Sequence, residues 1–301
     1  YTAHGLTSLV DVNPFIIGAG YRLYNTPDTS TYSYLEEFKN VSNASYNGFE
    51  TNLTKRISSG ENPWLAGTFF TLAYTYSHEI DNASGFRQRN STVPYYNPNY
   101  FRGSGDTDLR NVVAFSGGWQ LPFDQLWKSG PKLLTKGWAL YPIISYQSGF
   151  PLDVFANYNT TRSDPGPSGA GDAGLVRANL VGSKVTTYNI SQFQSINGNP
   201  GNYYFSPNNF SIPASDPNNL TYGSFPRNGL RGPSFFNVNM SIAKQFYIGE
   251  RFNLEFRADM FNMFNNVQFQ SPDLTITDPT FGQVSTTYDP RIIQLALHLK
   301  F

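Results

Sequence analysis

The chain has 301 residues with 21 Lys+Arg and 21 Asp+Glu, so its formal net charge is zero, and only 14% of its residues are charged. Because neither a basic excess nor a basic run is present, the composition excludes the electrostatic surface by which proteins bind nucleic acid. The sequence contains no cysteine, which excludes disulfides, thiolate nucleophiles and cysteine-based metal sites.

The hydropathy of the chain bears on how it meets a membrane. No run of about 18 consecutive apolar residues is present, so the sequence predicts no transmembrane helix. A membrane-spanning β-strand needs only about 9 to 11 residues, of which every second one is apolar. The negative mean hydropathy of this chain is therefore compatible with a transmembrane β-barrel.

In chain order, apolar and polar residues alternate in about nine segments, which predicts strands. Residues 1–10 and 15–25 are the weakest candidates, and 43–57, 64–78 and 109–121 alternate more clearly. The segment 137–149 is mixed, and Pro142 within it would remove one hydrogen bond from a sheet. In the clearer segments, the residues predicted to share apolar faces are Phe49, Leu53, Ile57, Phe70, Leu72, Tyr74, Tyr76, Leu109, Val113, Phe115, Trp119 and Leu121.

The three segments nearest the C-terminus alternate most strictly. In the middle one, the face opposite the apolar residues carries Arg251, Glu255, Arg257 and Asp259. On a lipid-facing surface an Arg would cost about 2 to 4 kcal/mol at mid-bilayer, so we expect these charges to line the lumen. A catalytic or ion-binding cluster is the less favoured interpretation. The apolar faces of the three segments consist of Phe236, Val238, Met240, Ile242, Phe252, Leu254, Phe256, Ala258, Met260, Ile293, Leu295, Leu297, Leu299 and Phe301.

The connections between the predicted strands differ systematically in length. Long connections at 26–42, 79–108, 150–233 and 265–289 alternate with shorter ones at 58–63, 122–136 and 247–251. Outer-membrane barrels have short periplasmic turns and long extracellular loops. The sequence therefore predicts an all-β fold, an antiparallel transmembrane β-barrel portion with long extracellular loops, of which 150–233 is the longest insertion.

The residues that covalent or metal chemistry needs are scattered. His4, His78 and His298 lack the spacing of a metal site, and no Gly-x-Ser-x-Gly motif supplies a serine nucleophile. The loop 162–174, rich in Gly, Pro and Ser, lacks the Gly-Lys-Ser/Thr ending of a phosphate-binding loop, so a flexible surface loop is the simpler interpretation. We expect no enzymatic activity, no metal and no cofactor.

From about residue 40 to the end, the chain resembles the TonB-dependent, Oar-like outer-membrane receptors. The densest matches are RNGLRGP at 227–233 and FRADMFNMFN at 256–265, which look like that family's final hairpin. Further matches in the family's order are Ser45-Tyr46-Asn47, Lys55-Arg56, Tyr74-Thr75-Tyr76-Ser77, Leu121-Pro122-Phe123, Gly137-Trp138, Ser148-Gly149-Phe150-Pro151, Phe281-Gly282 and Pro290-Arg291-Ile292-Ile293-Gln294.

The resemblance implies a receptor in the bacterial outer membrane that takes up an extracellular ligand, with outer-membrane lipid around it. Residues 1–301 are expected to be the C-terminal part of the barrel domain. The plug and the segment that contacts the inner-membrane TonB energising complex are expected outside this chain. The resemblance also implies that Phe301 is recognised by the barrel-assembly machinery, the alternative being an ordinary apolar chain end. The ligand, whether sugar, peptide or metal chelate, stays open.

Aromatic residues in two predicted outer loops are candidates for ligand contact. The first loop carries Tyr95, Tyr96, Tyr100 and Phe101, and the second carries Tyr203, Tyr204 and Phe205. Loop packing and interfacial anchoring are the alternative, because tyrosine suits those roles equally well.

Two other functions remain open at this stage. A small closed porin or structural barrel would need no plug, and eight strands are enough to close one. A secreted β-sandwich adhesin or carbohydrate-binding module would share the strands and aromatics without needing a lipid-facing apolar band. An open sheet with two free edges is not stable in hydrocarbon, which favours membership in a larger barrel.

Overall fold

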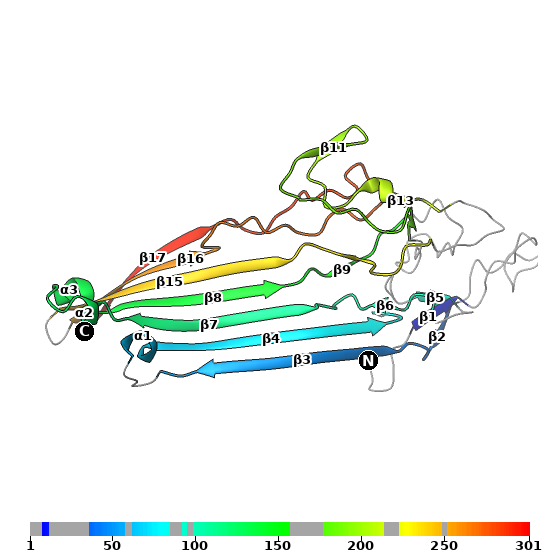
Figure 1. The fold of residues 1–301 in the computed structure, drawn as a ribbon. Helices are drawn as coiled ribbons and strands as arrows, with labels where there is room; N and C mark the ends of the chain where they lie inside the picture. The colour runs from blue at the N-terminus through cyan, green and yellow to red at the C-terminus, as the bar shows by residue number, and fades with distance from the viewer. Residues whose placement is uncertain are drawn as a thin grey trace, which may run out of the picture.

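The computed structural model describes residues 8–11, 36–57, 62–84, 92–94, 99–156, 177–213, 223–248 and 252–301. Its main feature is one large antiparallel sheet (Figure 1). The long strands are β3 (Ala44–Lys55), β4 (Thr68–Asp81), β7 (Asn111–Leu121), β8 (Trp138–Gln147), β15 (Phe235–Ile248), β16 (Phe252–Phe261) and β17 (Ile292–Lys300).

The sheet is a meander in which each long strand pairs with the next long strand in sequence, in the order β17-β16-β15-β8-β7-β4-β3. A short strand, β6 (Gly103–Ser104), pairs with the end of β4. Within the described residues no helix is long and apolar enough to cross a membrane. The predicted all-β, antiparallel fold and the strands predicted from residue 43 onward are confirmed.

The two weakest predicted strands lie mostly outside the described residues. Of the predicted segments 1–10 and 15–25, the structure describes only residues 8–10. They are part of β1 (Ser8–Asp11), a strand of a separate small sheet. There β1 pairs antiparallel with β2 (Glu36–Lys39) and parallel with β5 (Thr92–Pro94).

Strand register separates an apolar face of the large sheet from a polar face. Leu297 pairs with Phe256, and Leu295 pairs with Ala258, so the apolar residues of neighbouring strands stand side by side. Successive residues of a strand point to opposite faces, so the intervening residues form the polar face. The side chains of Leu295 and Leu297 are 66% and 65% exposed to solvent. A continuous exposed apolar band of this kind indicates contact with another apolar phase.

Pro142 lies inside β8, and the sheet accommodates it by a local gap in pairing. Met240 of β15 stands opposite Pro142, whereas pairing between β7 and β8 is interrupted from Gly117–Gly118 to Tyr141–Pro142 and resumes in the same register. A Cβ on Gly118 would lie 2.5 Å from the ring of Phe69, so the absence of a side chain lets that ring cover the gap. The strand predicted at 137–149, where the alternation is mixed, is therefore present.

Short helices occupy two connections at one end of the sheet, on the left of Figure 1. The first, α1 (Pro63–Ala66), precedes β4 and is capped by the side chain of Asn62. The connection from β7 to β8 holds α2 (Phe123–Leu126) and α3 (Lys132–Thr135). These connections are short, so this end of the strands is called the short-connection end below.

The opposite end of the strands, called the loop end below, carries the longer connections and a compact cluster of short elements (Figure 1). Three short strand pairs stabilise this cluster. They are β9 (Pro151–Leu152) with β14 (Leu230–Arg231), β10 (Asn179–Leu180) with β13 (Phe210–Ser211), and β11 (Gln194–Ile196) with β12 (Asn199–Gly201). The single-turn helix η2 (Pro207–Asn209) directly precedes β13. Its core is Leu152, Val154, Ala178, Phe205, Phe210, Phe225, Leu230 and Phe281.

Candidate functional site: the polar face and the loop end

The charged residues that the sequence predicts on one side of the sheet lie on the polar face of β15, β16 and β17. Arg257 donates from Nε to Asp259 Oδ1 at 2.8 Å and from Nη2 to Ser241 Oγ at 3.1 Å. The hydroxyl of Ser241 also hydrogen-bonds to the Asp259 carboxylate. Lys300 Nζ lies 3.2 Å from Glu255 Oε2. The charges therefore neutralise one another across three strands. Arg251, the fourth residue predicted here, lies outside the described residues.

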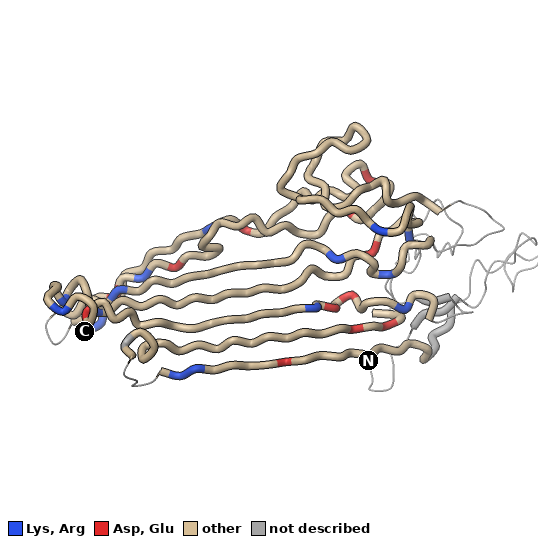
Figure 2. Tube along the Cα trace, in the orientation of Figure 1, with Lys and Arg blue, Asp and Glu red and all other residues tan. Residues whose placement is uncertain are grey.

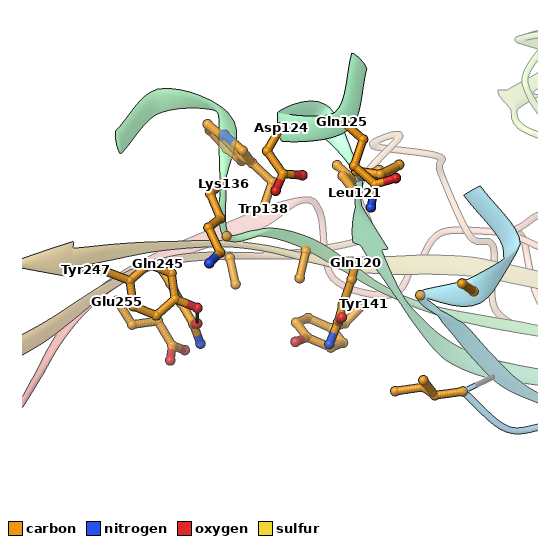
Figure 3. Close-up of a pocket in the computed structure, with 17 residues that line it drawn as sticks. Gln120, Leu121, Asp124, Gln125, Lys136, Trp138, Tyr141, Gln245, Tyr247 and Glu255 are labelled. Atoms are coloured by element: carbon orange, nitrogen blue, oxygen red, sulfur yellow. Dashed lines mark hydrogen bonds between the residues drawn. The ribbon is translucent and has the colours of Figure 1, made fainter. Parts of the chain in front are cut away.

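A cavity of about 540 Å³ opens beside this face at the short-connection end (Figure 3). Side chains of the polar face line it from β7, β8, β15 and β16, and the connection between β7 and β8 closes one side. Tyr247 donates its hydroxyl to Gln245 Oε1 at 2.7 Å, and Lys136 Nζ lies 5.3 Å from the centroid of the Tyr247 ring. The labelled lining residues are Gln120, Leu121, Asp124, Gln125, Lys136, Trp138, Tyr141, Gln245, Tyr247 and Glu255.

At the loop end, one arginine joins the insertion to the sheet. The side chain of Arg227 is completely buried and forms ion pairs with Asp81 at the end of β4 and, at 3.2 Å, with Asp106. It also donates to the backbone oxygen of Phe101 at 3.5 Å and to the hydroxyl of Ser84. A buried charge is stable only when it is paired and hydrogen-bonded. This set of contacts therefore fixes the insertion against β4.

A second arginine forms a parallel connection four residues further along the chain. Arg231 pairs with the carboxylate of Asp108, which also lies 3.1 Å from Arg110 Nε and accepts from the backbone N–H of Glu79 at 2.9 Å. Burial alone would raise the pKa of Asp108, but the hydrogen bond from Glu79 and the charges of Arg231 and Arg110 outweigh it. The pKa of Asp108 is therefore held below its ordinary value of 3.8.

Arg177 and Asp153 form a buried ion pair inside the insertion. Arg177 Nε lies 2.6 Å from Asp153 Oδ2, and the two side chains are only 1% and 3% exposed. Burial raises the pKa of Asp153 and lowers that of Arg177, while each charge opposes the shift of the other. The guanidinium stacks on the ring of Phe101, with Cζ 4.1 Å from the ring centroid. This stacking ties the insertion to the connection that follows β4.

Among the described residues, most of the predicted loop aromatics lie inside the protein. Tyr203 is 1% exposed, and Tyr204 donates its hydroxyl to the backbone oxygen of Arg231 at 2.6 Å. Phe101 is 5% exposed under Arg177, whereas Tyr100 is 44% exposed. Tyr95 and Tyr96 lie outside the described residues. Their burial favours loop packing for Phe101, Tyr203 and Tyr204, and Tyr100, whose ring packs edge-on against that of Phe101, is the most exposed of these described candidates.

Sequence reasoning did not single out Arg227 and Arg231 as site residues, although both lie in the densest matching motif. Their partners Asp81 and Asp108 lie more than a hundred residues away in sequence, at separations of 146 and 123. No local pattern predicts pairing over such a distance. Phe301, which sequence reasoning did single out, is 95% exposed at the end of β17.

No group of metal-binding side chains occurs among the residues that the structure describes. The fold and its exposed apolar band define the class of protein, a membrane β-barrel. The chain belongs to the outer membrane beta barrel domain family, whose model matches residues 2–294. No curated protein and no solved structure matches the chain. The protein is therefore located in the bacterial outer membrane, and the secreted β-sandwich alternative is excluded. That the apolar face meets lipid and the polar face lines the lumen stays a prediction.

Proposed function

We propose that this chain forms the C-terminal part of the barrel of a ligand-uptake receptor that resembles the TonB-dependent, Oar-like receptors. A small porin needs only a polar lumen. A receptor also needs a shaped surface at its extracellular mouth, where a scarce ligand is bound before it is taken up.

The observation that carries the proposal is the folded insertion at the loop end. Residues 150–233 and the connection that follows β16 share one hydrophobic core, in which Phe205, Phe210 and Phe281 pack edge to face at ring distances of 5.2 to 5.7 Å. Arg227 and Arg231 fix this body to the connection after β4. Such a platform supports recognition better than a set of independent flexible loops, because little conformational entropy is lost when the ligand binds.

In this proposal the polar face and the cavity of about 540 Å³ line the path below the platform. Parts of the complete protein outside this chain would carry the plug and the contact with the inner-membrane energising complex. The barrel-assembly machinery would recognise the strand that ends at Phe301. No catalysed reaction and no cofactor is included.

The test uses the complete reading frame, expressed in its own outer membrane and reconstituted into vesicles. A receptor is expected to give a heat-modifiable band, to leave vesicles closed to small ions, and to be captured by the periplasmic domain of TonB. Open vesicles with no capture by TonB would overturn the proposal in favour of a small porin. Closed vesicles without capture would instead support a structural barrel.

A further inference from the structure

All four tryptophans of the chain, Trp64, Trp119, Trp127 and Trp138, lie at the short-connection end. Trp119 and Trp138 stand on the lipid-facing side of β7 and β8, where Trp138 pairs with Leu121 and Trp119 with Leu140. Tryptophan is enriched where a membrane meets water. This end of the sheet therefore marks one boundary of the bilayer.

The helices of this end pack against lipid-facing residues at the strand ends, while Asp124, Gln125 and Lys136 of the same connection also line the cavity beside the polar face. Trp138, which points to the lipid side, donates from Nε1 to the backbone oxygen of Leu134 in α3 at 2.8 Å. Its ring lies 6.5 Å from that of Phe123 in α2. In α1, the ring of Trp64 lies 5.5 Å from that of Trp119. The helices thus extend the lipid-facing surface past the strand ends.

The connection from β7 to β8 has the composition of a segment that lies in a membrane interface. Its apolar side chains are largely exposed: Leu126 59%, Trp127 56%, Leu133 55% and Leu134 57%. Residues 122–137 carry three lysines and one acidic residue, giving a local charge of +2 (3 − 1) in a chain with no net charge. Exposed apolar groups beside lysines are typical of segments that bind anionic lipid in the interface. Figure 2 shows lysines and arginines gathered at this end.

The three lysines of this connection are Lys128, Lys132 and Lys136, and all are exposed. Within the described part of the chain, none of them forms an ion pair with a carboxylate. The charges of Lys128 and Lys132 are thus available to groups outside the protein, whereas Lys136 lines the cavity and its ammonium lies over the Tyr247 ring.

Lys244 of β15 holds this connection in place. It stands at a lipid-facing position opposite Trp138, yet it is only 2% exposed. Its ammonium group donates to the backbone oxygen of Lys136 and, at 3.2 Å, to that of Gln245, and lies 4.7 Å from the centroid of the Phe246 ring. A charged group that bends toward the interface in this way is protected from hydrocarbon. Lys244 therefore acts as a positioning residue for the end of α3.

We propose that residues 122–137 form a binding surface for anionic phospholipid of the periplasmic leaflet. Leu126, Trp127, Leu133 and Leu134 enter the interface, and Lys128 and Lys132 contact lipid phosphates. Because outer-membrane barrels place short turns on the periplasmic side, the phosphate is that of a phospholipid and not that of surface lipopolysaccharide. Continuity with the lipid-facing residues of β7 and β8 identifies the occupant as lipid and not as a protein partner.

The experiment uses the complete folded protein in vesicles of phosphatidylcholine mixed with phosphatidylglycerol. One lipid at a time is brominated in its acyl chains, and tryptophans outside residues 1–301 are replaced by phenylalanine, so that quenching of tryptophan emission reports which lipid surrounds this end. We expect brominated phosphatidylglycerol to quench more strongly than brominated phosphatidylcholine at equal content. A combined Lys128→Gln, Lys132→Gln variant is expected to lose this preference, with an effect of up to about five-fold for each lysine.

The matched control for Lys132→Gln is Lys184→Gln, a lysine that is also exposed but lies at the loop end, and this variant is expected to leave the preference unchanged. Each variant is first checked for a heat-modifiable band, so that misfolding is recognised. Equal quenching by both lipids in the unchanged protein would overturn the proposal. So would a preference that survives in the combined variant, or one abolished by inorganic phosphate, which would indicate a site for free anions.

Discussion

Buried arginines decide how the loop end of this protein is organised. Arg227 and Arg177 have almost no exposed surface, and each is paired with an aspartate that is equally buried. Such pairs add little stability beyond that of well-packed apolar residues, but breaking one is costly because a charge is left without its partner. Their role is therefore best understood as fixing one arrangement of the insertion on the sheet.

Replacing Arg227 by Ala is expected to release the insertion from β4. The buried carboxylate of Asp81 would lose its partner, at a cost of about 3 to 5 kcal/mol. Limited proteolysis of the folded protein should then cleave between 150 and 233, while heat-modifiable migration persists. The control is Arg257→Ala, because the Arg257 side chain is 44% exposed on the polar face. Equal protease resistance of the Arg227 variant and the unchanged protein would contradict this prediction.

Asp108 makes the second arginine connection sensitive to acid. Its pKa is lower in the folded protein than its ordinary value of 3.8, so its stabilisation is complete above that value. The stabilisation is lost as the pH falls through the lowered folded pKa. Hydrogen exchange of residues 227–231 should therefore accelerate at that acidic pH and not at neutral pH. Asp108→Asn should show the accelerated exchange already at neutral pH, and an unchanged exchange rate in that variant would refute the assignment.

At the scale of strands, alternation was enough to predict which way most side chains point. Glu255, Arg257 and Asp259 share a face because strand geometry has a period of two, whatever the surroundings. By contrast, α1, α2 and α3 have four residues each, which is too short for a helical period to appear in the sequence. The sequence predicts β8 less clearly, because Pro142 cannot donate a backbone hydrogen bond to the sheet. It does not show that Gly117 and Gly118 of β7 stand opposite, where the pairing is interrupted and then resumes.

The assignment of the two faces has a direct test in β17. Leu297→Arg is expected to cost about 2 to 4 kcal/mol in a bilayer, because it places a charge in hydrocarbon. Ala296→Arg, one residue away on the polar face, should cost much less. Urea unfolding in lipid vesicles measures both values. Equal losses in the two variants would show that the assignment of faces is wrong.

At the scale of the molecule, the sequence predicted the class of protein and the difference between the two ends of the sheet. Connection lengths carried this information, since each long strand pairs with the next one along the chain. The packing of the loop end was beyond sequence reasoning. It depends on contacts such as Arg227 with Asp81, 146 residues apart, and on the burial of Tyr203, which a list of aromatic residues does not reveal.

The orientation of the protein in the membrane is expected to place the short-connection end in the periplasm. The chain has no cysteine, so single cysteines at Leu133 and Phe193 can serve as markers in it. Phe193→Cys, at a position 71% exposed in the insertion, should react with a membrane-impermeant maleimide in intact cells. Leu133→Cys should react only after the outer membrane is permeabilised. The opposite pattern would reverse the orientation.

Because the tryptophans of this chain lie at one end of the sheet, their emission can report only one step of its insertion into a membrane. When the unfolded protein is added to vesicles, the rise in emission from the tryptophans of this chain follows the arrival of a single rim of the barrel at the bilayer. The passage of the large loops through the membrane produces no such signal, because all four tryptophans lie at the other end. A fast emission phase would therefore precede completion of the barrel, and tyrosine or label-based probes at the loop end are needed to time the last step.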